Sequence, residues 1–161
     1  MFASISESNI LGILWYLHHL LPPHQKVYTD ESGSKLRKKF SIQDSQESFA
    51  IVATSEEELN IKLNLLRLLN TNIQPRLLIV GSILKIEKIF IYFDGIQYPM
   101  VKMLTATDLL FKLFFVFNLE FPSESALFYS FLQIFFYEIP SDKKFTKIHT
   151  LKNDILSVNE M

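Results

Sequence analysis

The sequence predicts an α+β fold, with a small mixed β-sheet of about four strands covered by about four helices. Two apolar runs flank an amphipathic segment between residues 49 and 80, which is the strand–helix–strand order of a right-handed crossover unit. Asp94-Gly95 separates two β-rich runs, as in a two-residue hairpin. Two Phe-rich segments then follow with helical spacing. The expected strands lie near residues 49–53, 76–80, 89–93 and 96–99, and the expected helices near residues 6–21, 56–69, 105–118 and 124–138.

The first expected helix covers residues 6–21. Ser4 and Glu7 have the spacing of a capping box, apolar residues follow at helical intervals, and Pro22-Pro23 blocks continuation of the helix. Residues 22–48 are polar, and we expect them to form a long connection that contains at most a short strand near residues 26–29.

The crossover unit lies in the middle of the chain. Residues 49–53 form a short apolar run, and Ser55 and Glu58 have capping-box spacing at the start of an amphipathic helix that reaches residue 69. Residues 76–80 are continuously apolar, which is typical of a strand buried on both faces. We therefore expect this strand to pair in parallel with the first one.

The second half supplies a hairpin and two helices. Asp94-Gly95 suits a type I′ turn because both central residues need positive φ. Thr105 and Asp108 have capping-box spacing at the start of a helix that is apolar nearly all round, so we expect that helix to be central. Ser123 is placed to cap the last helix.

The length of 161 residues and the mass of 18.8 kDa fit one domain. We place this single α+β domain at residues 1–140. Residues 141–161 are polar and carry several lysines, so we expect them to form a loosely ordered tail.

Composition excludes several classes of protein. With 48% hydrophobic and 20% charged residues, the chain is neither disordered nor collagen-like. The formal net charge of -1 argues against a general basic surface that wraps nucleic acid. The absence of Cys excludes disulfide scaffolds, thiolate zinc sites and cysteine nucleophiles. No apolar run is long and uninterrupted enough for a membrane span, and we expect an intracellular protein, nuclear or cytoplasmic.

Three of the four histidines cluster near the end of the first helix, at His18, His19 and His24, and the fourth is His149. Adjacent helical residues point about 100° apart, so at most one of the first two could share a metal ion with His24. No acidic residue stands at a spacing that would complete such a site. The sequence therefore predicts no metal and no cofactor.

A basic run is formed by Lys35, Arg37, Lys38 and Lys39. It is either a solvated loop or the phosphate contact of a nuclear, nucleic-acid-associated protein. Acidic residues on both sides offset its field, and Phe40 is the one aromatic residue directly beside it. We prefer the solvated loop, so nucleic acid is not an expected partner.

Catalytic motifs are sparse. Residues 77–82 resemble a strand that enters a phosphate loop, but a single glycine there predicts only a tight turn. The Gly-x-Ser-x-Gly elbow of serine hydrolases is absent. Asp108 and Lys112 form either a structural ion pair, which we prefer, or a small acid–base site with a shifted pKa. The sequence assigns no catalytic residue.

The Phe-rich helices carry the clearest functional expectation. Phe accounts for 15 of the 161 residues, and Phe128, Phe131 and Phe135 recur at helical spacing. These rings belong either to an ordinary core or to a surface that packs against a second copy or another protein, where aromatic side chains are favoured anchors. A lipid-binding pocket is a third alternative.

Several stretches between residues 9 and 139 form a recognisable set. They are SIQDSQESF at 41–49, NIQP at 72–75, IVG at 79–81, FDGI at 93–96 with Tyr98, DLLFK at 108–112, NLEFP at 118–122 with Glu124 and Ser125, FLQ at 131–133 and YEI at 137–139. Together they resemble the C-terminal region of an uncharacterised animal protein family that occurs in many copies in arthropods and fish. Tyr129 departs from the Trp that relatives tend to carry. The resemblance implies a shared fold, a stand-alone or truncated version of a longer protein and an association with mobile elements, but no activity.

We therefore expect a non-catalytic protein-interaction or self-association module that uses its Phe-rich C-terminal helices, with itself or another protein as the partner. One alternative is a small enzyme with an acid–base site near Asp108 and Lys112. The other is a nuclear, nucleic-acid-associated protein that uses residues 35–39.

Overall fold

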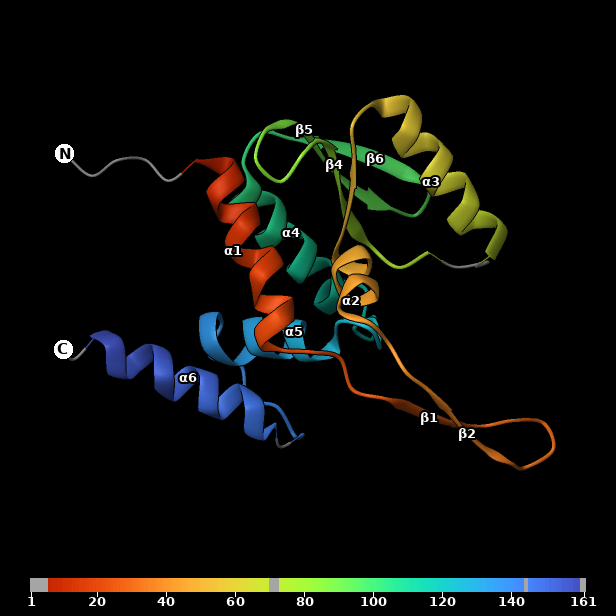
Figure 1. Ribbon diagram of the computed structural model, residues 1–161, viewed down its shortest axis with the longest axis vertical. Helices are drawn as coiled ribbons and strands as arrows, with labels where there is room; N and C mark the ends of the chain where they lie inside the picture. Colours follow the sequence, from red (N-terminus) through yellow and green to blue (C-terminus); the bar gives the residue numbers. More distant parts are fainter. Residues whose placement is uncertain (1–5, 70–72, 144, 160–161) are drawn as a thin grey trace.

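The computed structural model describes residues 6–69, 73–143 and 145–159. In these residues the chain forms six α-helices, one short π-helix and two sheets, of four and two strands (Figure 1). The strands are β1 (Lys26–Thr29), β2 (Lys35–Lys38), β3 (Ala50–Ala53), β4 (Arg76–Gly81), β5 (Ile86–Phe93) and β6 (Ile96–Met100). The helices are α1 (Glu7–Leu20), α2 (Ile42–Phe49), α3 (Glu56–Leu69), α4 (Met103–Val116), α5 (Ala126–Phe131), the π-helix η1 (Leu132–Phe136) and α6 (Thr146–Asn159). The predicted α+β class is confirmed.

The four-stranded sheet is mixed and has the order β3-β4-β5-β6. β3 runs parallel to β4, with Ile51 opposite Leu78, and α3 is the crossover that connects them. The other neighbouring strands are antiparallel. Asp94 and Gly95 connect β5 to β6 with φ values of 49° and 81°, so the predicted hairpin is confirmed.

The two faces of the sheet belong to two different cores. Side chains alternate along a strand, so in β4 Leu77 and Ile79 face the main core, whereas Leu78 and Val80 face a smaller one. α3 packs on the smaller core from one side of the sheet, and α1, α4 and α5 lie on the other side (Figure 1).

The main core is aromatic, and this accounts for much of the Phe content. Its largest fully buried side chains are Phe49, Phe111, Phe114, Phe128, Tyr129 and Phe131. The Phe111 ring stacks on Tyr137 with centroids 4.0 Å apart, and the Phe128 ring stacks on His18 with centroids 4.1 Å apart. Such aromatic pairs stabilise the fold by more than the burial of their surface area alone would.

Residues 22–48 contain more structure than the sequence predicts. β1 and β2 pair into an antiparallel hairpin that extends away from the rest of the molecule, and α2 follows it (Figure 1). Ser41 caps α2 by accepting a hydrogen bond from the Asp44 backbone N–H, and the Asp44 carboxylate accepts one from the Ser41 backbone N–H. The predicted short strand near residues 26–29 is confirmed as β1, whereas the prediction that the rest is a polar connection is wrong, because residues 35–38 pair with β1 and hydrogen bonds hold the polar residues of α2.

α4 packs on the sheet and on α1, but it is not covered on nearly every side as its composition predicts. Its first residue is Met103, whose backbone N–H donates to the Glu7 carboxylate, so the predicted capping box at Thr105 does not form. One face of α4 packs on the sheet, while Leu104 and Val116 are 62% and 74% exposed. The apolar periodicity correctly predicts that this segment is a helix. In the single chain, however, the face of α4 that carries Leu104 and Val116 stays in contact with solvent.

The C-terminal segment forms α6, although its polarity predicts a loose tail. Ile148 of α6 is 0% exposed and belongs to the main core, and Leu151 and Ile155 pack against that core at helical intervals. Three apolar residues on one face are enough to dock the helix. The folded domain thus continues beyond residue 140.

α1 begins at Glu7 and is capped by Ser6, whose side chain accepts a hydrogen bond from the Asn9 backbone N–H. The predicted capping box at Ser4 lies outside the described residues. Within those residues, none of the helices combines the length and apolar character that crossing a bilayer requires.

Candidate functional site

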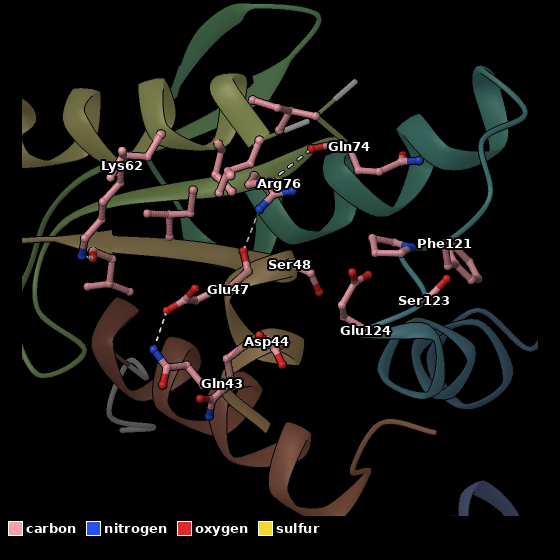
Figure 2. A pocket seen from close by; sticks show the side chains of 18 of the residues that line it. Gln43, Asp44, Glu47, Ser48, Lys62, Gln74, Arg76, Phe121, Ser123 and Glu124 are labelled. Carbon is pink, nitrogen blue, oxygen red and sulfur yellow. Dashed lines mark hydrogen bonds between the residues drawn. The ribbon is translucent and has the colours of Figure 1, made fainter. Parts of the chain in front are cut away.

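A groove of about 810 Å³ opens between α2, α3 and residues 120–124, which lie between α4 and α5 (Figure 2). Its position follows from the parallel pairing of β3 and β4. α2 leads directly into β3 and residues 73–75 lead into β4, so both approaches meet at the same edge of the sheet. The groove therefore combines segments that are far apart in the sequence.

One wall of the groove is apolar and comes mostly from α3. Leu65, Leu66 and Leu69 line it. Leu65 and Leu69 are 55% and 79% exposed, whereas Leu59 and Leu63 on the other side of α3 are buried against the sheet. α3 is thus apolar on two sides, of which only one is covered by the described residues.

Arg76, the first residue of β4, extends into the middle of the groove (Figure 2). Its Nη1 donates to the Glu47 carbonyl oxygen at 3.1 Å, and its Nε donates to the Gln74 carbonyl oxygen at 3.3 Å. Burial lowers the pKa of the Arg76 guanidinium, which stays protonated because arginine titrates far above neutral pH. The first bond ties α2 to the start of β4, the second holds the guanidinium against residues just before the strand, and together they use two of the five N–H donors of Arg76.

The rest of the groove's charge is mainly acidic. Its acidic side chains are Asp44, Glu47, Glu120 and Glu124, and its other basic side chains are Lys26 and Lys62. The Lys62 ammonium lies 2.9 Å from the Glu58 carboxylate and donates to the Val52 carbonyl oxygen, so its charge is already matched. The groove therefore offers carboxylates next to an apolar wall.

Buried hydrogen bonds hold α2 in place beside the groove. The Ser48 hydroxyl lies 2.7 Å from the Ser125 hydroxyl and 2.8 Å from the Ser45 carbonyl oxygen. The Ser45 hydroxyl lies 2.8 Å from Nδ1 of His18. Because His18 and Ser45 are both 0% exposed, this Ser–His pair is closed to any substrate and acts structurally.

The other histidines lie apart from this network. The His19 ring stacks on Tyr16 at the surface of α1, and His24 and His149 are exposed. The described residues contain no group of three or more His, Asp or Glu side chains arranged to hold a metal ion.

Asp108 and Lys112 form an ion pair on α4, with 2.7 Å between the Lys112 ammonium and the Asp108 carboxylate. The Tyr137 hydroxyl donates to the other Asp108 oxygen at 2.7 Å. Lys112 and Tyr137 lower the pKa of Asp108, so the carboxylate stays ionised at neutral pH and is a poor proton donor. Neither the groove nor a second hollow of about 510 Å³ near Asn118 includes this pair. The Tyr137–Asp108 hydrogen bond connects the residue after the π-helix to α4. This arrangement gives the acid–base alternative no support.

The three Phe residues predicted to belong either to the core or to an interface differ in burial, although the Phe131 and Phe135 rings stack with centroids 5.1 Å apart. Phe128 and Phe131 are 0% and 1% exposed and lie in the main core, because α5 is enclosed by α1, α2 and α6 rather than lying on the surface. Phe135 is partly buried, and Phe136, which follows it in the π-helix, is 61% exposed. Phe128 and Phe131 are therefore core residues and not surface anchors of the single chain.

The basic residues Lys35, Arg37 and Lys38 belong to strand β2, and Lys39 follows it. All eight residues of β1 and β2 are exposed. The basic run is thus part of a hydrogen-bonded hairpin and not of an irregular loop.

The groove was not predicted from the sequence, because α2, which forms one of its walls, was not predicted. The signal that could have revealed this helix is the Ser41-x-x-Asp44 spacing, which is that of a capping box, followed by Phe49 at the helix end. The parallel pairing of β3 with β4 was predicted, but without α2 it does not show that Arg76 lies next to the Glu47 carbonyl oxygen.

Comparison with models of protein families, with curated proteins and with solved structures finds no match to this chain.

Proposed function

We propose that the protein is a protein-interaction module whose groove binds a partner segment that carries apolar side chains next to Lys or Arg. The observation that carries the proposal is the exposed leucine pair Leu65 and Leu69, at 55% and 79%, on the wall of a groove with an acidic rim. Contiguous exposed apolar side chains rimmed by polar ones are typical of protein-binding surfaces.

The apolar wall supplies the affinity in this proposal. Ile61, Leu65, Leu68 and Leu69 recur at helical intervals on the outer side of α3, and each is more than half exposed. Leu65 and Leu69 lie within the groove, where a partner's apolar side chain can be enclosed rather than merely touched. Enclosed apolar anchors dominate the free energy of most interfaces.

The acidic rim supplies selectivity. Glu47, Glu120 and Glu124 face the groove, and the nearby Lys62 is paired with Glu58. The lining has four carboxylates against the cations Lys26, Lys62 and Arg76, so a cationic side chain beside the apolar anchor would meet more carboxylates than cations. We therefore expect the partner segment to be basic.

The test is a selection from a random-peptide phage library with the full chain as the target. The selected peptides should combine Leu, Ile, Phe or Met with Lys or Arg. Their affinity should fall at least tenfold for Leu65→Ser/Leu69→Ser and also for Glu120→Gln/Glu124→Gln. The matched control is Leu104→Ser/Val116→Ser, which removes two exposed apolar side chains of α4 outside the groove.

Peptides that bind both groove variants as tightly as the wild-type protein would contradict the proposal. So would a selection that enriches acidic peptides.

A further inference from the structure

The β1–β2 hairpin is the most strongly charged surface feature that the groove does not explain. Residues 26–40 hold five basic side chains and two acidic ones, a formal charge of +3, although the whole chain has -1. The hairpin extends away from the body of the molecule (Figure 1), and every residue of its two strands is exposed. The net charge of the whole chain is therefore a poor guide to the charge of this hairpin, which is strongly basic.

The acidic residues of this hairpin are separated from the basic ones. Asp30 and Glu31 lie at the tip, beyond the strands, and every charged residue within β1 and β2 is basic. The Asp30 carboxylate accepts hydrogen bonds from the Ser32 hydroxyl at 2.6 Å and from the backbone N–H groups of Ser34 and Ser32 at 2.8 and 3.0 Å, and these bonds lower its pKa. The Asp30 carboxylate thus bonds to the turn, and among the described residues it forms no salt bridge with a cation of the strands.

The register places like charges opposite each other. Lys26 pairs with Lys38 across the two strands, and such directly opposed like charges destabilise a hairpin. Arg37 and Lys35 lie on the other face, opposite Val27 and Thr29. No salt bridge among the described residues involves any of these four cations. An anion bound along the hairpin would relieve this repulsion.

We propose that the β1–β2 hairpin binds double-stranded DNA, with Lys26, Lys35, Arg37 and Lys38 contacting phosphate groups. A two-stranded antiparallel ribbon is one of the two protein elements that the major groove of B-form DNA admits. The deep, narrow major groove of A-form RNA does not admit it. A polar, acidic tip is also unsuited to insertion into a lipid bilayer, so the hairpin fits DNA better than a membrane surface.

The test measures the binding of the full chain to a fluorescein-labelled DNA duplex of about 20 mixed base pairs by fluorescence anisotropy at 50 and 200 mM salt. Four phosphate contacts should weaken binding by about 150-fold between these two salt concentrations. In Lys35→Gln/Arg37→Gln/Lys38→Gln one contact remains, and the loss should shrink to about threefold, with weaker binding at 50 mM.

The matched control is Lys85→Gln/Lys102→Gln/Lys147→Gln, which makes the same change in net charge at three exposed lysines outside the hairpin. This control should bind the duplex with nearly the wild-type affinity and salt dependence. Hydrogen exchange on the wild-type protein provides a second measurement that needs no variant, because duplex DNA should slow exchange of the backbone amides of residues 26–38.

Three results would overturn the proposal. They are the absence of binding to the duplex at 50 mM salt, an equal loss of affinity in both triple variants, and tighter binding to RNA duplexes or to vesicles of anionic phospholipid than to DNA.

Discussion

At the scale of single residues, His18 illustrates how an environment can remove the charge from a titratable side chain. Its ring is 0% exposed, stacks on Phe128 and contacts Ser45 through Nδ1, while Nε2 has no hydrogen-bond partner among the described residues. Burial, helped by the neighbouring His19, lowers the pKa of His18 from 6.5 to about 3. The imidazole is therefore neutral in the folded protein at physiological pH.

The shifted pKa makes the free energy of unfolding depend on pH. Between pH 6.5 and 3 the unfolded chain binds the proton and the folded chain does not, so stability is lost as the pH falls through this window. The expected loss is about 1.4 kcal/mol per pH unit, or about 2–3 kcal/mol between pH 6.5 and 4.5.

His18→Gln removes the titrating group and keeps a polar side chain beside Ser45. Urea unfolding at pH 6.5 and 4.5 should show that this variant loses about 2–3 kcal/mol less than the wild-type protein over the same interval. Equal losses in the two proteins would show that His18 does not control acid stability.

At the scale of elements, α2 shows how a polar segment becomes part of a core. Its residues Ser45, Gln46 and Ser48 are buried, and each makes a hydrogen bond to α1, to its own helix or to the start of α5. Buried polar groups are tolerated only when they are paired in this way. The position of α2, and with it one wall of the groove, therefore depends on a few specific bonds.

The Ser48–Ser125 bond is testable by a double-mutant cycle. Ser48→Ala leaves the buried Ser125 hydroxyl without this partner and should cost about 1–3 kcal/mol of unfolding free energy. Ser48→Ala/Ser125→Ala should cost less than the sum of the two single changes, because the second change removes the unsatisfied hydroxyl.

Urea unfolding of the four proteins provides the measurement. Ser157→Ala, at an exposed position of α6, should change the unfolding free energy by less than about 0.5 kcal/mol. Strict additivity of the two core changes would contradict the coupling.

At the scale of the whole molecule, the aromatic side chains divide into a core and a surface. Phe128 lies among His18, Phe49 and Tyr129, whereas Phe136, eight residues later, is 61% exposed. Self-association through the C-terminal helices stays a prediction, and only exposed rings such as Phe136 could contribute to it directly. The exposed face of α4, with Leu104 and Val116, lies outside the groove and is not assigned a partner.

Substitutions of the two Phe residues should separate these roles. Phe128→Ala should cost about 3–5 kcal/mol because it leaves a cavity in a packed core, and Phe128→Glu should unfold the protein. Phe136→Glu should leave the protein folded and change its stability by less than about 0.5 kcal/mol. Circular dichroism reports folding, and sedimentation equilibrium reports mass.

The mass measurement also tests self-association. If the C-terminal helices join two copies, Phe136→Glu should convert a wild-type dimer into a folded monomer. A wild-type protein that is monomeric at high micromolar concentration would contradict this prediction.

Local sequence patterns were sufficient to predict several elements. α3 has apolar periodicity and an N-terminal capping bond from the Glu58 backbone N–H to the Ser55 hydroxyl, and β4 is a continuous apolar run. The turn at Asp94-Gly95 needs positive φ at both positions. The patterns were insufficient for α2 and α6, because their composition is polar and their stability comes from a few buried contacts such as Ser48 with Ser125 and Ile148 with the main core. The preferred assignment of the basic run to a loop failed for a related reason, since cross-strand pairing is not visible in either strand alone.

The sequence by itself determined the α+β class, the crossover unit and the hairpin, because each is assembled from consecutive segments whose own local patterns identify them. Only the tertiary structure decided which apolar faces are buried, that Phe128 and Phe131 are core residues, and that Arg76 meets α2 in a groove. These outcomes depend on contacts between residues that are distant in the sequence. Periodicity shows that a helix has an apolar face, but it does not show what covers that face.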